Sequence, residues 1–133
     1  MTNTTKLWNI QLRVPAEPEF LGIVRLACAG LAHRLGLDHE LSEDFKLAAT
    51  EACGHLLNLG SQEIEINWDV SSDSVTLQVQ AVGEIDEDLV DDEADLEWKE
   101  IGLLLIKSVM DEVVELQSPP GLRLVKRTEI QDD

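Results

Sequence analysis

Residues 45–60 read FKLAATEACGHLLNLG, and two alternating runs follow them: EIEINWDV at 63–70 and SVTLQVQAV at 74–82. The first stretch repeats apolar side chains every three or four positions, which predicts an amphipathic helix. The two later runs alternate apolar and polar residues around the serine-rich residues 71–74, which predicts a β-hairpin. A helix followed at once by a hairpin is therefore the centre of the predicted fold.

The predicted central helix has two distinct faces. We expect it to begin at Ser42 as N-cap and to end at Gly60. Its expected core face consists of Phe45, Ala48, Ala49, Ala52, Leu56 and Leu59. The other face brings Glu51, His55 and Asn58 together at i, i+4 and i+7, which by itself indicates a polar helix face with a weak side-chain pair.

Further elements surround this centre on both sides. Residues 8–14 alternate as a strand, residues 17–35 have helical spacing, and residues 96–110 predict a third helix. The expected core positions of the third helix are Ile101, Leu104, Leu105 and Val109. Short strands are expected around residues 114–116 and 122–125. The order β-α-α-β-β-α-β-β predicts an α+β two-layer sandwich, with a mixed or antiparallel sheet and three helices on one face.

Composition limits the function classes. The 133 residues form a single domain by size, and they carry 10 basic against 27 acidic side chains, a net charge of −17. Such a charge disfavours nucleic acid and anionic membranes as partners, because both would be repelled. The sequence contains no apolar run long enough for a membrane span, and Cys28 and Cys53 lie in apolar helical patterns without CxxC spacing. We therefore expect a reduced, cytoplasmic chain with buried cysteines and no metal site.

Several strings in this order are similar to the anti-sigma factor serine kinases of bacterial partner-switching systems. They include VPA at 14–16 before a helix with IVRL at 23–26, KLAATEAC at 46–53, GLLLI at 102–106 and VMDEV at 109–113. That family belongs to the GHKL ATPases, which have the Bergerat nucleotide-binding fold. The resemblance implies one histidine kinase-like ATPase domain over residues 1–133.

The resemblance also implies where a nucleotide site would lie. Glu51 matches the general base, but His55 stands where the family has the Asn that holds Mg²⁺, and imidazole is a poor Mg²⁺ ligand. In Ala81-Val82-Gly83, Ala81 stands where the family has the carboxylate that reads adenine, and Gly83 remains as a turn residue. The phosphate-binding Gly-x-Gly is reduced to Gly102, with Glu100 in place of the other glycine. We therefore expect no bound cofactor.

The stretch that corresponds to the family's nucleotide lid is strongly acidic. Residues 84–100 carry ten carboxylates against one lysine. We expect an acidic lid loop at about residues 84–96, mobile as far as Asp95, whose charge has the wrong sign for a triphosphate. Trp98 is expected either as a hydrophobic staple at the start of the third helix or as an exposed anchor for a partner.

The resemblance implies a function through protein binding. The expected partners are a sigma factor or a STAS-domain antagonist, with Arg25 on the first helix at the interface, and a homodimer is a further expectation. One alternative is an active protein serine/threonine kinase that uses ATP and Mg²⁺. Another is a scaffold module with no sigma factor involved.

Overall fold

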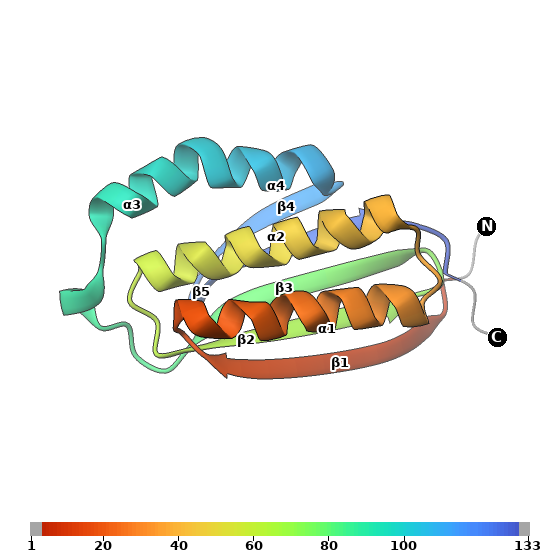
Figure 1. Ribbon diagram of the computed structural model, residues 1–133, viewed down its shortest axis with the longest axis horizontal. Coiled ribbons are helices and arrows are strands. Elements are labelled where there is room, and N and C mark those ends of the chain that lie inside the picture. Colours follow the sequence, from red (N-terminus) through yellow and green to blue (C-terminus); the bar gives the residue numbers. More distant parts are fainter. Residues whose placement is uncertain (1–3, 131–133) are drawn as a thin grey trace.

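The computed structural model describes residues 4–130, which form a five-stranded sheet with helices on one face (Figure 1). All strand pairs are antiparallel, in the order β1-β2-β3-β5-β4. The strands are β1 (Lys6–Pro15), β2 (Glu63–Ser71), β3 (Ser74–Val82), β4 (Glu112–Gln117) and β5 (Pro120–Arg127). The predicted element order and the α+β two-layer architecture are confirmed, and the sheet is antiparallel rather than mixed.

The first two helices, α1 (Leu21–Arg34) and α2 (His39–Asn58), cover the centre of the sheet (Figure 1). A short 3-10 helix, η1 (Pro18–Phe20), precedes α1. The predicted start of α2 is wrong: Asp38 is its N-cap, and its carboxylate accepts a hydrogen bond from the Leu41 amide at 2.9 Å. Both Asp38 and Ser42 are good capping residues, and the extra turn adds no apolar residue to the core face that could have decided between them.

The third helical segment begins earlier than predicted. It consists of α3 (Asp92–Glu97), a π turn η3 (Trp98–Gly102) and α4 (Leu103–Val109), after a 3-10 turn η2 (Glu87–Leu89). The acidic loop therefore ends at Asp91, and residues 92–96 are helical rather than part of a loop. No helix in the described range of 4–130 is long and apolar enough to cross a membrane.

The π turn changes which face of this helix is buried. The Leu103 amide donates to the carbonyl oxygen of Trp98, five residues back, so this turn contains one residue more than an α turn. The buried positions are Gly102, Leu103, Ile106 and Met110, whereas the predicted Ile101, Leu104 and Leu105 are exposed and Val109 is half-buried. The predicted core face was thus wrong: each buried residue lies next in sequence to a residue that was predicted to be buried.

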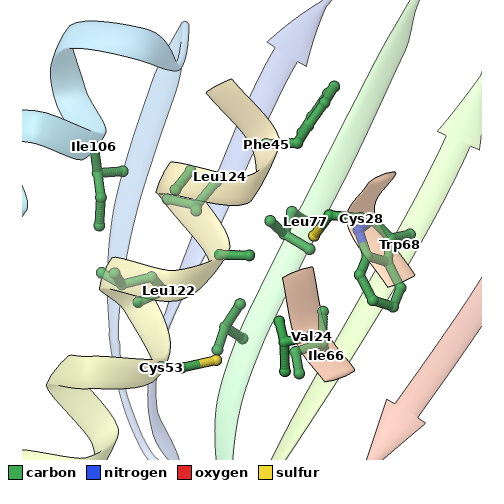
Figure 2. Packing of buried hydrophobic residues seen from close by; sticks show 14 of the residues in the cluster. Val24, Cys28, Phe45, Cys53, Ile66, Trp68, Leu77, Ile106, Leu122 and Leu124 are labelled. Atoms are coloured by element: carbon green, nitrogen blue, oxygen red, sulfur yellow. The ribbon is translucent and has the colours of Figure 1, made fainter. Parts of the chain in front are cut away.

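The core lies between the sheet and the helices (Figure 2). Val24 and Cys28 of α1, Phe45 and Cys53 of α2, and Ile106 of α4 pack onto the inward side chains of β2, β3 and β5. Burial raises the pKa of both thiols to about 12. The expectation of buried, unreactive cysteines agrees with these positions.

Candidate functional site

The candidate site lies where α2 runs antiparallel to the segment α3–η3–α4 (Figure 1). The backbone fixes this arrangement at the C-terminal end of α2, where the Asp91 amide donates to the Asn58 carbonyl oxygen at 2.8 Å. Glu51 and His55 point from α2 toward the facing segment, and Gly102 faces them from η3. The structure therefore brings together three of the residues that the sequence assigned to a nucleotide site.

His55 is buried, with 8% of its surface exposed. Its Nδ1 lies 2.8 Å from Oδ1 of Asp95, and because a carboxylate only accepts hydrogen bonds, the ring N–H donates. Asp95 is also buried and receives Lys99 Nζ at 3.5 Å from its second oxygen. The sequence predicted an exposed polar stripe at this position, and it missed Asp95 because the two partners are 40 residues apart.

Trp98 covers the other side of His55. The two rings stack with centroids 4.0 Å apart and an interplanar angle of 17°. The indole N–H donates to the carbonyl oxygen of Glu51 at 2.8 Å, and 6% of Trp98 is exposed. Both roles expected for Trp98 are therefore wrong, because its ring is buried against α2 and is not an exposed anchor or a staple at the start of a helix.

Gly102 is needed because of this same packing. A Cβ atom at Gly102 would lie 2.6 Å from Trp98 Nε1 and 2.9 Å from Oε2 of Glu51. The glycine thus allows the indole ring to lie flat against the helix, with the half-buried Glu51 carboxylate beside it. In this arrangement, Gly102 accommodates a side chain of the protein itself.

Gly83 has a separate role at the end of β3. It has a φ of +84°, a conformation that favours glycine, and a Cβ atom at this position would meet the side chain of Gln62. Ala81, at the position of the expected adenine-reading carboxylate, is buried as part of the core. These positions form a strand end and a turn, as the sequence predicted for Gly83.

Arg25 lies on the exposed side of α1, next to α2. Together with Lys46 and Thr50 of α2 it lines an open cleft that reaches Glu51. Lys46 is held by Glu43 at 2.7 Å within this cleft. The surface predicted to contact a partner and the predicted general base therefore share one cleft between α1 and α2.

Comparison with known proteins agrees with the fold. The sequence profile of the histidine kinase-like ATPase domain matches residues 14–126. The chain belongs to the histidine kinase-like ATPase domain family. Its similar relatives include serine-protein kinases named RsbW. That of Oceanobacillus iheyensis is 32% identical over 78% of this chain and 76% of its own length. That of Bacillus velezensis is 32% identical over 90% of this chain and 84% of its own length. That of Bacillus subtilis is 31% identical over 78% of this chain and 75% of its own length.

The acidic segment that follows β3 is attached to the chain just after the end of α2. Asp86 donates its amide hydrogen to the carbonyl oxygen of Gly60 at 2.9 Å, and Ile85 packs against the core. Most acidic side chains of the segment are exposed, but Asp95 is turned inward to His55. Asp95 is thus the one buried carboxylate of this segment, while Asp86 and Asp91 cap short helical turns at the surface.

The side chains present at the expected magnesium position are unlike a typical Mg²⁺ site. Mg²⁺ is bound mainly by oxygen ligands in octahedral geometry. Here the expected ligand position is an imidazole whose Nδ1 is bonded to Asp95 and whose face is covered by Trp98. Within residues 4–130, no three His, Cys, Asp or Glu side chains converge in a way that could hold a metal ion. The side chain at this position does not fit the role of a Mg²⁺ ligand.

Proposed function

We propose that this chain is a regulatory member of a bacterial partner-switching system that acts by binding a sigma factor or a STAS-domain antagonist and has lost nucleotide binding. The family and the relatives named serine-protein kinase support the regulatory part. The single observation that supports the loss of nucleotide is the Trp98–His55–Asp95 packing, which fills the family's magnesium position with side chains of the chain itself.

The electrostatics of the site favour the same conclusion. Phosphoryl transfer depends almost wholly on positioning and on neutralising phosphate charge. The exposed Glu100 takes the place of a glycine in the expected phosphate cradle. A like-charge contact at ~4 Å costs about 4 kcal/mol at an effective dielectric constant near 20. The Glu100 carboxylate would therefore oppose a triphosphate in this cradle.

Calorimetric titration with ATP and Mg²⁺ tests this proposal. We expect no binding heat at millimolar ATP and no phosphate transfer to a STAS-domain protein, with the Bacillus subtilis RsbW kinase as the positive control. Micromolar ATP affinity, or phosphate transfer that Glu51→Ala abolishes, would instead support an active protein serine kinase. That alternative is favoured by one feature, the retained Glu51 carboxylate in the cleft beside Arg25.

Arg25 provides the test of the binding role. A guanidinium offers a rigid fork of donors for a partner carboxylate, and interface arginines often cost about 2 kcal/mol or more when truncated. We expect Arg25→Ala to weaken binding of a sigma factor or STAS-domain protein at least about tenfold, with stability changed by less than about 0.5 kcal/mol. Lys107→Ala, which removes an exposed cation of α4, is the matched control. Equal affinity of the wild-type and Arg25→Ala proteins would exclude α1 from the interface.

A further inference from the structure

The outer side of α3–η3–α4 exposes large apolar side chains that the core does not use. Leu96, Ile101 and Leu104 are 60%, 54% and 66% exposed, and Leu105 is 39% exposed. Single exposed apolar residues are normal, but several together on one helix indicate an interaction surface. From the π turn onward the core contacts are made by Gly102, Leu103 and Ile106, which leaves Ile101, Leu104 and Leu105 exposed.

Two of these side chains form one wall of a groove between α2 and α3–η3–α4. Ile101 and Leu105 form this wall, and Glu51 belongs to the facing helix. Gly54 of α2 and Gly102 of η3 also line the groove, and a Cβ atom at Gly54 would meet nothing within 4 Å. The two helices run antiparallel, so that a third helix could lie along the groove and contact both.

Carboxylates surround the apolar wall. Glu51 and Glu97 line the groove, and Glu100 is exposed on the same helical segment. Lys99 is directed to Asp95 at 3.5 Å, which leaves Lys107, beyond Leu104, as the other cation of the segment. The negative charge is therefore concentrated over α3 and η3.

We propose that this groove binds an amphipathic helix with a basic polar face, supplied by a partner protein. The apolar side of such a helix would pack on Ile101 and Leu105, and its lysines or arginines would face Glu97 and Glu51. A helix laid into a groove is a common recognition mode, with anchors at i, i+3 or i+4, and i+7. A second copy of this chain is disfavoured as the occupant, because it would bring the same carboxylates on a chain of net charge −17.

This surface is distinct from the cleft at Arg25, although Glu51 borders both. It requires α3–η3–α4 to lie against α2 as the Trp98–His55 stack holds it. It does not require that the partner be a sigma factor or a STAS-domain protein. If Arg25→Ala left partner binding unchanged, the groove proposal would still stand. If the peptide did not bind in the groove, the proposed role of Arg25 would still stand.

A labelled peptide is the direct probe. It is a helical peptide of about 18 residues, or five turns, with leucines at i, i+3 or i+4 and i+7 and lysines elsewhere. Fluorescence anisotropy should give a Kd on the order of 10 μM at low salt, and affinity should fall as salt rises. A peptide of the same composition with a scrambled pattern, and a leucine–glutamate peptide, should bind at least about tenfold more weakly. Equal binding of the scrambled peptide would overturn the proposal.

Variants of the full chain locate the bound peptide. The double change Ile101→Ser and Leu105→Ser should weaken binding at least about tenfold, as should Gly54→Phe, which would fill the groove from α2 and leave its apolar wall in place. Leu26→Ser, at a 74% exposed leucine of α1, is the matched control and should bind normally. Circular dichroism checks folding. Unchanged affinity in the folded groove variants would contradict the proposal, as would an equal loss in Leu26→Ser.

Discussion

Replacing Trp98 tests the packing on which the proposed function depends. Trp98→Ala removes the ring that stacks on His55 and leaves the Glu51 carbonyl oxygen without its indole donor. It also opens space next to Gly102, where the helix backbone carries no side chain that could fill the cavity. All three effects destabilise the native state.

The size of the effect follows from the burial of Trp98. A fully buried Trp→Ala change costs about 3–5 kcal/mol, and at 6% exposure Trp98 belongs to that class. Within this total, the lost hydrogen bond accounts for about 1 kcal/mol and the stacked pair for about 0.5–1.5 kcal/mol. Trp98→Phe keeps a ring on His55 but removes the donor, so it should cost only about 1–2 kcal/mol.

Urea denaturation followed by far-ultraviolet circular dichroism measures both variants without depending on tryptophan fluorescence. We expect the order wild type, Trp98→Phe, Trp98→Ala in decreasing free energy of unfolding, with similar m-values. A loss below about 1 kcal/mol in Trp98→Ala would refute the reasoning, because a ring so easily removed could not be holding α3–η3–α4 against α2.

Three further predictions concern the hydrogen bond of His55, the packing at Gly102 and the two buried cysteines. Asp95→Asn should cost about 1.5–3 kcal/mol in urea denaturation, because it removes the charged acceptor of a buried hydrogen bond. Gly102→Ala should destabilise by about 1–3 kcal/mol because its Cβ would meet the indole ring, whereas Gly22→Ala, in open space on α1, should stabilise by about 0.5–1 kcal/mol. Burial raises the pKa of Cys28 and Cys53 to about 12, while unfolded thiols titrate near about 8.5. Above about pH 9 the unfolded chain releases protons that the native chain keeps, so the free energy of unfolding should fall toward pH 12. The double Cys→Ala variant should show a shallower fall.

The parts of the fold that follow from local periodicity could be predicted from the sequence. The core face of α2 and the hairpin of β2 and β3 have regular spacings of 3.6 and 2, and both spacings hold along the whole element. The antiparallel pairing of β2 with β3 then follows from a short turn at residues 72–73. Only Leu59 of the expected α2 face is not fully buried.

The site could be predicted only in part, because its decisive contacts are not local. Glu51, His55 and Gly102 were identified as candidates, but the partners of His55 lie 40 or more residues away in a segment whose composition indicates a solvated loop. The π turn adds one residue without any sequence signal such as proline. Within the acidic run, the spacing of Asp95 and Lys99 at i, i+4 is the one local hint of a helix.

Restoring the family's residue at position 55 should not restore nucleotide binding. His55→Asn supplies an oxygen ligand, but Trp98 would still cover the position, and Ala81 would still lack a carboxylate for adenine. We therefore expect His55→Asn to lose about 1–3 kcal/mol of stability, through the lost stack and a weaker bond to Asp95, and to show no ATP binding heat.

A double-mutant cycle of His55→Asn and Trp98→Ala separates the two causes of this loss. Because the two rings are in contact, their effects on stability should be non-additive by about 0.5–3 kcal/mol. If the effects were additive, the stack would contribute nothing to the position of α3–η3–α4. If His55→Asn alone bound ATP at micromolar concentration, then His55 by itself, and not the ring above it, would be what closes the site.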